Sequence, residues 1–286
     1  MVREGSSIDK ALAVLEAIAE HHRVTDIAAA TGVSKSTVHR ILQSLVEWGF
    51  ARADGTGGYE PGPRILTLAG RVMTRFDPSR QASAALRALH ERTGYTTHFG
   101  IRSGDEAVYV DKLEGRRPYQ MPSRVGMSLR LHSTAIGKAI LAALGDDEVR
   151  AIAGRTGLTR LTPATITDID DLLDHLGTVR ALGYSMDDEE NEPSIRCVGA
   201  AVFDHTGQVL GGISISALAM DMEPDALERL APVVVGAARE VSLALGAPSR
   251  AQAGTEAFPG AASEPRESTR ASRSGRGSGL RRPMTT

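Results

Sequence analysis

A run of small polar side chains and cations near residue 40 has the residue types that recognise DNA. Hydroxyl, imidazole and amide groups hydrogen-bond to base edges in the major groove, and cationic side chains bind phosphate. A further cation follows nearby, in a segment that reads as a strand. The candidate DNA-binding residues are Lys35, Ser36, Thr37, His39, Arg40, Gln43 and Arg52.

A helix-turn-helix is the element that would present this run to a groove. The sequence predicts a short first helix capped by Thr25. It ends at Gly32, where the turn favours a left-handed conformation and therefore glycine. Ser34 caps a second helix. The polar run lies on the solvent-facing side of this helix. The apolar residues of the opposite side recur at steps of three and four: Val38, Ile41, Leu42, Leu45 and Val46.

The same spacing would also suit two amphipathic helices in an ordinary helical domain. The residues that follow favour DNA binding. Residues 50–52 predict a short strand, residues 54–55 a turn, and residues 58–60 a return strand ended by Pro61 and Pro63. A helix-turn-helix followed directly by a small hairpin is a winged helix, so the sequence predicts a winged helix-turn-helix DNA-binding domain over residues 1–62.

The chain of 286 residues is long enough for a second domain. We expect a linker helix at 63–78, a second domain at 79–247 and a tail at 248–286. One side of the linker helix carries Leu66, Ala69, Val72 and Met73, which predict a seam between two subunits; the alternative is packing within one chain. The tail is rich in Ala, Ser, Gly, Arg and Pro and is expected to be disordered. Its arginines either add weak non-specific DNA affinity or are merely solvated.

Composition excludes several classes of protein. No apolar run approaches the roughly 20 residues of a membrane span, and we see no signal peptide. Cys197 is the only cysteine, so an intrachain disulfide is impossible and a cysteine-based zinc site is unsupported. We therefore expect a cytoplasmic protein that has no membrane, metal or cofactor partner. The net charge is −2. The excess of acidic over basic residues lies in the middle of the chain, and this part would repel DNA.

The second domain alternates strand and helix patterns. Helices are expected at 83–93, 134–144, 168–182 and from 223 to about 245, and strands at 97–102, 107–113, 194–203 and 209–218. The last two strands flank Asp204-His205-Thr206-Gly207, which reads as a hairpin turn. Strand pairs interleaved with helices predict an α+β domain with an antiparallel sheet.

The ordered motifs of the chain resemble the IclR family of transcriptional regulators over roughly residues 6–246. They are the segment TDIAAATGVSKSTVHRILQSLVEWGF, LRLHSTAIGKAILA at 129–142, GYSMDDEENEPSIRCVGAAVFDHTGQVLGGISIS at 183–216, and the closing helix. The resemblance implies a GAF-like α/β effector-binding domain behind the winged helix. It also implies dimers formed through the DNA-binding half, which often pair into tetramers.

The resemblance further implies a pocket on one face of the GAF-like sheet for a small carboxylate or aromatic acid. The matching residues are Ala135, Ile136, Asp187, Cys197, Ser214 and Ser216. The residues themselves agree in part, because Ser214 and Ser216 share one face of a strand and the helix after Thr134 offers free N–H groups to an anion. The alternatives are a solvent-facing pair of serines and a Cys197 that merely packs in the core. The branched side chain of Ile136 is expected to shrink the pocket or favour an apolar ligand.

Catalysis is the main rival class. The acidic residues between 187 and 192 resemble an acid/base or metal cluster, but consecutive positions on an extended segment point to alternating sides, which favours a solvated acidic loop. His132 and Cys197 would suit a thiol nucleophile pair, but no local motif supports it, and His132 reads as a residue leading into a helix. P-loop, HExxH and GxSxG motifs are absent from the sequence. The sequence therefore predicts a non-enzymatic regulator that binds a pseudo-palindromic DNA operator and responds to a small anionic or aromatic-acid metabolite.

Overall fold

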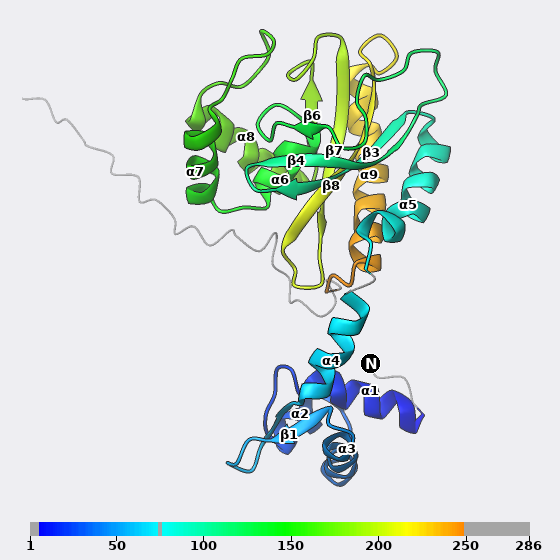
Figure 1. The fold of residues 1–286 in the computed structure, drawn as a ribbon, viewed down its shortest axis with the longest axis vertical. Helices are drawn as coiled ribbons and strands as arrows, with labels where there is room; N and C mark the ends of the chain where they lie inside the picture. The colour runs from blue at the N-terminus through cyan, green and yellow to red at the C-terminus, as the bar shows by residue number, and fades with distance from the viewer. Residues whose placement is uncertain (1–5, 74–75, 249–286) are drawn as a thin grey trace, which may run out of the picture. The chain divides into compact units, whose positions relative to one another are not determined.

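The computed structural model describes residues 6–73 and 76–248, so the predicted tail lies outside the described residues from residue 249 on. The chain divides into two compact units, one ending at Asp77 and the other beginning at Pro78. Figure 1 labels the elements of both units. None of the helices in the described ranges is long and apolar enough to cross a membrane.

The N-terminal unit is the expected winged helix. Its helices are α1 (Ser7–Ala17), α2 (Val24–Thr31) and α3 (Lys35–Glu47). The wing is an antiparallel pair, β1 (Ala51–Ala53) and β2 (Tyr59–Pro61), and α4 (Pro63–Met73) follows it. The three helices and the first wing strand enclose one hydrophobic core: Val14, Ile18, Ile27, Val33, Val38, Leu42 and Ala51.

The turn between α2 and α3 has the predicted chemistry. Gly32 ends α2 in the left-handed region, at φ 68°, as expected from its place after the helix. The predicted cap at Thr25 is wrong, because α2 begins at Val24 and its N-cap is Arg23, which forms no side-chain cap bond. Val24 packs against the core, which favours the earlier start. Thr25 lies inside the first turn and its hydroxyl donates to Asp26.

The C-terminal unit is built on one antiparallel sheet of six strands, in the order β5-β4-β3-β8-β7-β6. The strands are β3 (Thr96–Ser103), β4 (Glu106–Leu113), β5 (Ser128–Leu129), β6 (Ser185–Asp188), β7 (Ile195–Phe203) and β8 (Val209–Leu218). The sequence predicts β3, β4, β7 and β8 within about two residues. It misses the two short edge strands.

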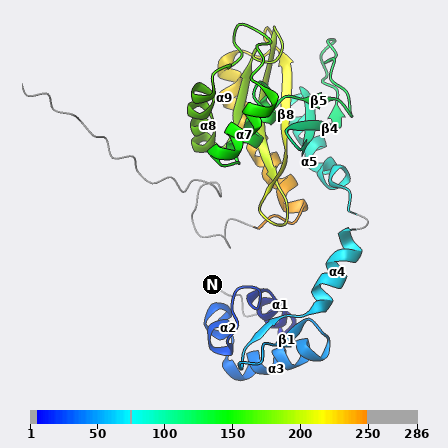
Figure 2. The same cartoon turned by 60° about the vertical axis from the view of Figure 1, so that its left-hand side comes forward.

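Helices cover both faces of this sheet (Figure 2). On one face α5 (Pro78–Thr93) packs on β3 and β4, and α9 (Pro224–Ala244) packs on β7 and β8. On the other face α6 (Ala135–Ala142) packs on β6, β7 and β8. Behind α6 lie α8 (Ile169–Leu182) and α7 (Asp146–Thr156), of which the sequence missed α7. This is the expected α+β architecture.

Glycines let α6 sit almost on the backbone of the sheet. A Cβ on Gly199 of β7 would lie 2.8 Å from the carbonyl carbon of Ala135, the first residue of α6. On the helix itself, a Cβ on Gly137 would lie 2.4 Å from the Cα of Leu131. Because neither space admits a side chain, the N-terminal turn of α6 is fixed directly above β7.

Candidate functional site

The exposed face of α3 carries the predicted DNA-binding residues. Ser34 caps the helix by accepting a hydrogen bond from Thr37 N. Val38 and Leu42 are fully buried on the inner face. The predicted residues of α3 lie on the opposite side, and all of them are exposed except the partly buried Thr37: Lys35, Ser36, Thr37, His39, Arg40 and Gln43. The helix therefore offers a polar, cationic surface of the kind that enters a major groove.

Three of these predicted residues, Ser36, Thr37 and Arg52, have side-chain partners within the unit. The Ser34 hydroxyl donates to Thr37 Oγ1 at 2.9 Å and lies 3.2 Å from Ser36 Oγ, so the start of α3 is a small hydroxyl cluster. On the wing, Arg52 Nε lies 2.8 Å from Glu60 Oε1. The two residues are directly opposite in the β1–β2 register. This pair holds the Arg52 guanidinium on the wing surface, and the sequence analysis did not foresee Glu60 as its partner.

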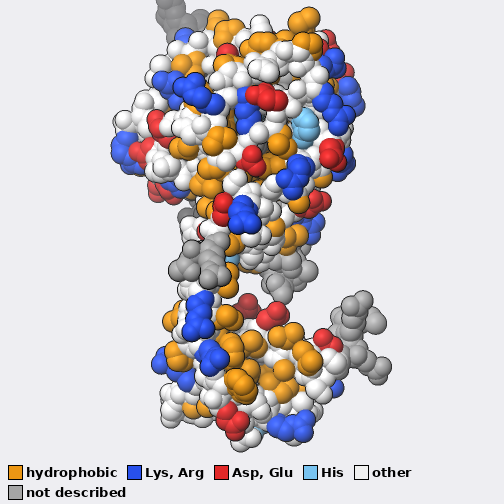
Figure 3. All heavy atoms as spheres, turned by 45° about the vertical axis from the view of Figure 1, so that its right-hand side comes forward, with side chains coloured by type: hydrophobic (Ala, Val, Ile, Leu, Met, Phe, Trp, Pro, Cys, Tyr) orange, Lys and Arg blue, Asp and Glu red, His pale blue; other side chains and the backbone are white. Residues whose placement is uncertain are grey.

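The N-terminal unit also has a large exposed apolar surface (Figure 3). In α4, Leu66 is 77 % exposed and Val72 is 55 % exposed, and Ala69 is exposed between them. The side chain of Met73, the fourth residue of the predicted seam, lies outside the described residues. Ile8 and Leu12 of α1 add to the apolar surface. Exposed apolar surface on this scale is typical of a protein interface.

Strand register brings the predicted effector residues of the sheet together. Asp187 of β6 lies opposite Cys197 of β7, which lies opposite Ser216 of β8. Ser214 lies opposite Gly199, directly under the start of α6. Since residues two apart share a face, Ser214 and Ser216 lie on the α6 side of the sheet. Both serines are buried, so the alternative of a solvent-facing pair is wrong.

The first turn of α6 completes this group from above. Thr134 caps the helix, since its hydroxyl oxygen accepts from Gly137 N at 3.0 Å. The N–H groups of Ala135 and Ile136 belong to the first turn, where a helix has no internal acceptor for them. The Ile136 side chain, however, packs over Gly100 and Gly212 and belongs to the hydrophobic core. Its branched side chain therefore fills the layer between helix and sheet, and the residue can offer a ligand only its N–H.

Asp187 is the most unusual ionisable group of this site. It is 2 % exposed, and its Oδ1 accepts hydrogen bonds from Glu190 N at 2.8 Å and Asn191 N at 3.2 Å. Burial, partly offset by Lys138, raises the pKa of Asp187 to about 7. Burial also raises the pKa of the Cys197 thiol, which therefore stays protonated. A carboxyl group that is half protonated near neutrality can accept or donate a hydrogen bond beside an anion.

The interpretation of residues 187–192 as a solvated acidic loop is wrong for two of its carboxyl groups. Asp187 and Glu190 are both buried, and Glu190 forms an ion pair with Lys138, which is fully buried in α6. The hydroxyls of Thr162 and Thr165 donate to the Glu190 carbonyl oxygen. The segment folds inward onto donors from α6 and from residues 162–165, although within the described residues Glu190 Oε2 has no hydrogen-bond partner. It is part of the support for α6.

Three residues that the sequence analysis did not single out lie on the same face of the sheet. His98 of β3 lies opposite Ser214, and Lys112 of β4 lies opposite His98. The ring of Tyr109 is 4.7 Å from the His98 ring, centroid to centroid. Burial, with the nearby Lys112 cation, lowers the pKa of His98 to about 3, so the ring is neutral. Only the pairing of distant strands reveals this neighbourhood.

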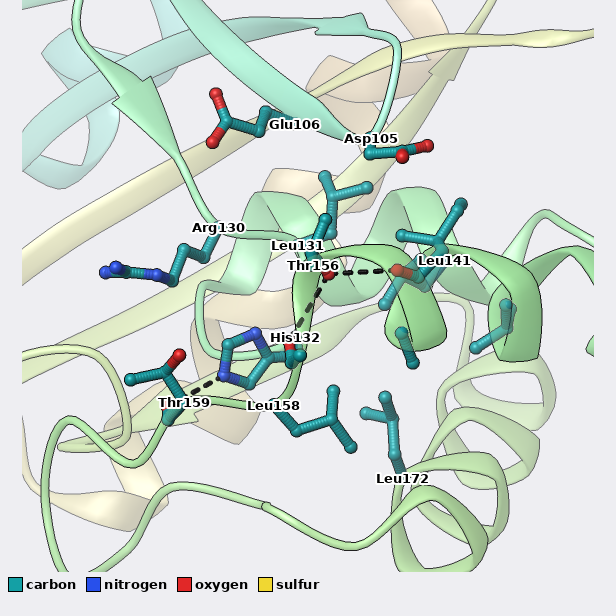
Figure 4. A pocket seen from close by; sticks show the side chains of 14 residues that line it. Asp105, Glu106, Arg130, Leu131, His132, Leu141, Thr156, Leu158, Thr159 and Leu172 are labelled. Atoms are coloured by element: carbon teal, nitrogen blue, oxygen red, sulfur yellow. Dashed lines mark hydrogen bonds between the residues drawn. The ribbon is translucent and has the colours of Figure 1, made fainter.

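A cavity of about 200 Å³ lies elsewhere in the unit, between α6, α7, α8 and the β3–β4 turn (Figure 4). Its apolar lining includes Leu141, Leu158 and Leu172, and Arg130 and His132 lie toward one side. His132 Nε2 donates to the Thr159 carbonyl at 3.0 Å. None of the six predicted effector residues lines this cavity. His132 thus acts as an anchor just before α6, as expected, and its ring nitrogen bonds to backbone.

Two protein-family models match the chain, one over its N-terminal part and the other over most of the rest. Residues 7–55 match the model described as the IclR helix-turn-helix domain. Residues 70–243 match the model described as the C-terminal part of the bacterial transcriptional regulator IclR. Together the two matches cover nearly all of the described residues.

Similar proteins agree with these matches. The HTH-type transcriptional regulator XynR of Escherichia coli K12 is 35 % identical over 247 residues, which are 85 % of this chain and 98 % of XynR. The regulator KdgR of the same organism is 34 % identical over 244 residues, covering 84 % and 93 %. Among solved structures, IclR of Thermotoga maritima has a TM-score of 0.58 at 35 % identity, covering 84 % of this chain and 98 % of that one. A regulator from Silicibacter has a TM-score of 0.77 at 25 % identity, covering 85 % and 97 %.

Proposed function

The chain belongs to the IclR family of HTH-type transcriptional regulators, and from this premise we propose which of its residues bind the operator and which bind the effector. It is a DNA-binding transcriptional regulator with a C-terminal effector-binding domain. The proposed division is a DNA-binding domain at 1–62, a linker at 63–78 that contains the helix α4, and the effector-binding domain at 79–247. We assign it no catalytic role, and we place it in the cytoplasm because operator DNA lies there.

The proposed operator contacts are the exposed residues of α3 together with Arg52 on the wing. Lys35 and Arg40 supply salt-dependent phosphate binding, whereas Ser36, Thr37, His39 and Gln43 discriminate bases. The supporting observation is that α3 buries Val38 on one side and leaves its polar side open. One winged helix covers too little DNA for tight selective binding. A homodimer on a pseudo-palindromic operator is therefore the proposed working unit, with a tetramer as its extension, and α4 is the candidate seam.

The proposed effector is a small organic acid bound against the sheet beside the N-terminal end of α6. The observation that carries this proposal is the convergence of Asp187, Cys197, Ser214 and Ser216 beneath the N–H groups of Ala135 and Ile136. Four polar side chains of three strands share one face below a helix start, where the helix dipole favours a negative charge. Binding alters operator affinity to the extent that it favours one arrangement of the DNA-binding domains over another.

Operator binding is tested by footprinting the protein on the DNA upstream of its own gene, followed by titrations at several salt concentrations. The double variant Lys35→Ala/Arg40→Ala should weaken binding to all sequences and flatten the salt slope. Arg150→Ala, which removes a cation from α7, is the control. Unchanged affinity in the double variant would contradict the assignment. Light scattering that finds a monomer at micromolar concentration, with and without DNA, would contradict the dimer.

Effector binding is tested with the double variant Ser214→Ala/Ser216→Ala. Pyruvate, 6-hydroxyhexanoate and benzoate are the probes, and the readout is operator affinity with and without each probe. The variant should lose its response to the probe that acts on the wild-type protein, while its operator binding without probe stays nearly the same. Ser103→Ala at the exposed end of β3 is the control. A normal response in the double variant would place the ligand elsewhere, and loss of folding would make the serines structural.

A further inference from the structure

His98 occupies the middle of the sheet face that holds the proposed effector residues. It lies on β3 between Ser214 of β8 and Lys112 of β4, and each is its direct partner in the strand register. The residue is 2 % exposed, and its ring is tilted by 32° against the ring of Tyr109. A buried imidazole must satisfy two ring nitrogens in this position, because an unpaired buried polar atom is costly.

The two nitrogens of His98 face different parts of the domain. Nδ1 lies 3.5 Å from the hydroxyl of Ser216, one of the proposed effector serines. Nε2 lies 2.8 Å from the hydroxyl of Ser123. The second distance is that of a good hydrogen bond, and the first is at the long limit. The Ser216 side is therefore where a ligand group with better geometry would be accepted most readily.

Ser123 belongs to the segment 114–127, here called the strap, which links β4 to β5. Lys112 ties the strap to the sheet, because its Nζ donates to the carbonyl oxygens of Met121 at 2.7 Å and Ser123 at 2.5 Å. The same ammonium group pairs with Glu114 at 2.7 Å. Met121 is buried and, with Ser216, borders a small cavity of about 10 Å³. The strap thus closes this end of the effector face, and His98 spans the space between strap and Ser216.

The charge state of His98 decides what chemistry it can recognise. Burial and the Lys112 cation lower its pKa to about 3, so the ring offers one N–H and one lone pair and no positive charge. A neutral imidazole suits a hydroxyl or carbonyl group better than a carboxylate. The carboxylate has its donors at the N-terminal end of α6, beside Gly199. From Gly199 to His98 the sheet spans two strand spacings, which is roughly 10 Å.

We propose that His98 is a recognition residue of the effector site, which hydrogen-bonds a hydroxyl or carbonyl group of the effector remote from its carboxylate and passes that contact to the strap through Ser123. The inference rests on the proposed function, since it assumes an acid bound at α6. It adds the ligand class: an acid several bonds long with a neutral polar group at its far end. A ligand group on Nδ1 fixes the ring, and the ring in turn fixes Ser123.

The first test needs no ligand. Amide hydrogen exchange of peptides from 114–127 is compared between the wild-type protein, His98→Phe and Ser123→Ala, with His205→Phe in an exposed turn as the control. Loss of one hydrogen bond should speed exchange of the strap about fivefold in the first two variants and leave it unchanged in the control. Unchanged exchange in both His98→Phe and Ser123→Ala would overturn the link to the strap.

The second test uses matched pairs of acids, 6-hydroxyhexanoate with hexanoate and 4-hydroxybutyrate with butyrate. Calorimetry of the wild-type protein should show at least one hydroxy acid binding about fivefold or more tightly than its partner. His98→Phe should lose this preference, and His98→Gln, which keeps a polar end, should retain part of it and serves if the Phe variant does not fold. No preference in the wild-type protein, or an undiminished preference in His98→Phe, would overturn the proposal.

The two proposals fail in different ways. If the preference for the hydroxy acid depends on His98 but no acid alters operator affinity, the regulatory link of the proposed function fails and the role of His98 stands. If acids alter operator affinity but the hydroxy and unsubstituted partners act equally, the proposed function stands and the role of His98 is overturned.

Discussion

Replacement of Asp187 by Asn should change how the stability of the C-terminal unit depends on pH. The buried carboxyl has a pKa of about 7, against the usual value of 3.8. The native state therefore holds a proton between these values that the unfolded state has released. Because the native state binds more protons in this range, the free energy of unfolding falls as pH rises from about 4 to 7, and the loss is complete above pH 7.

The size of the effect follows from the same two values. A difference of about three in pKa corresponds to about 4 kcal/mol, at about 1.36 kcal/mol for each unit. Asp187→Asn has no proton to lose and its amide oxygen can still accept from Glu190 N, whose bond to Asp187 is 2.8 Å. The free energy of unfolding of the variant, relative to that of the wild-type protein, should therefore rise by about 4 kcal/mol from pH 4 to pH 8. Glu190 also has a raised pKa and its charge contributes to the raised pKa of Asp187, so the difference between the two proteins includes the loss of this interaction.

Urea denaturation at pH 4, 5, 6, 7 and 8, followed by far-UV circular dichroism, measures this difference. Trp48 is the single tryptophan and lies in the N-terminal unit, so its fluorescence transition is an internal control that should be the same in both proteins. Asp174→Asn on the exposed side of α8 is the control for charge. Parallel pH curves for wild type and Asp187→Asn would refute the argument. The same titration should also weaken binding of anionic probes above pH 7, since Asp187 then carries a negative charge.

Three further substitutions test the support of the two sites. Gly199→Ala should destabilise the C-terminal unit by about 1–3 kcal/mol in urea denaturation, because the new Cβ would meet the first residue of α6 at 2.8 Å; equal stability would show that α6 can shift. Lys138→Met should cost about 3–5 kcal/mol at neutral pH by leaving Glu190 as an unpaired buried charge, and Lys138→Met/Glu190→Gln should recover much of that loss. Arg64→Ala should shift the emission of Trp48 and cost about 0.5–1 kcal/mol, since the guanidinium carbon lies 5.9 Å from that ring; an unchanged spectrum would count against this contact.

Local chemistry made much of the fold predictable. Gly32 and Gly183 end helices in the left-handed conformation, as their positions suggest. Asp204 accepts hydrogen bonds from Thr206 N and Gln208 N and so forms the hairpin turn expected at 204–207. These features depend on a few neighbouring residues, which is why the sequence is sufficient to place them.

Long-range pairing made the rest unpredictable. β3 pairs with β8, more than a hundred residues later, and this pairing alone brings His98 to Ser216. The strands β5 and β6 are too short to show a periodicity, and β6 carries Asp187 into a buried position. The acidic run after residue 186 looks solvated in sequence because the partners of Glu190, which are Lys138, Thr162 and Thr165, belong to other segments. The Asp187 carboxyl could thus be placed in the site by resemblance, but its burial could not.

The alternation of residues along β7 and β8 separates two tasks within the same strands. Val198, Ile213 and Ile215 point away from α6 and form the hydrophobic layer beneath α9, whereas Cys197, Ser214 and Ser216 face the proposed ligand. Neighbouring residues in sequence therefore experience different selection. A change of effector can proceed by substitutions at every second position while the hydrophobic layer, and with it the stability of the domain, is preserved. Such a sheet can diverge in ligand without having to be rebuilt as a fold.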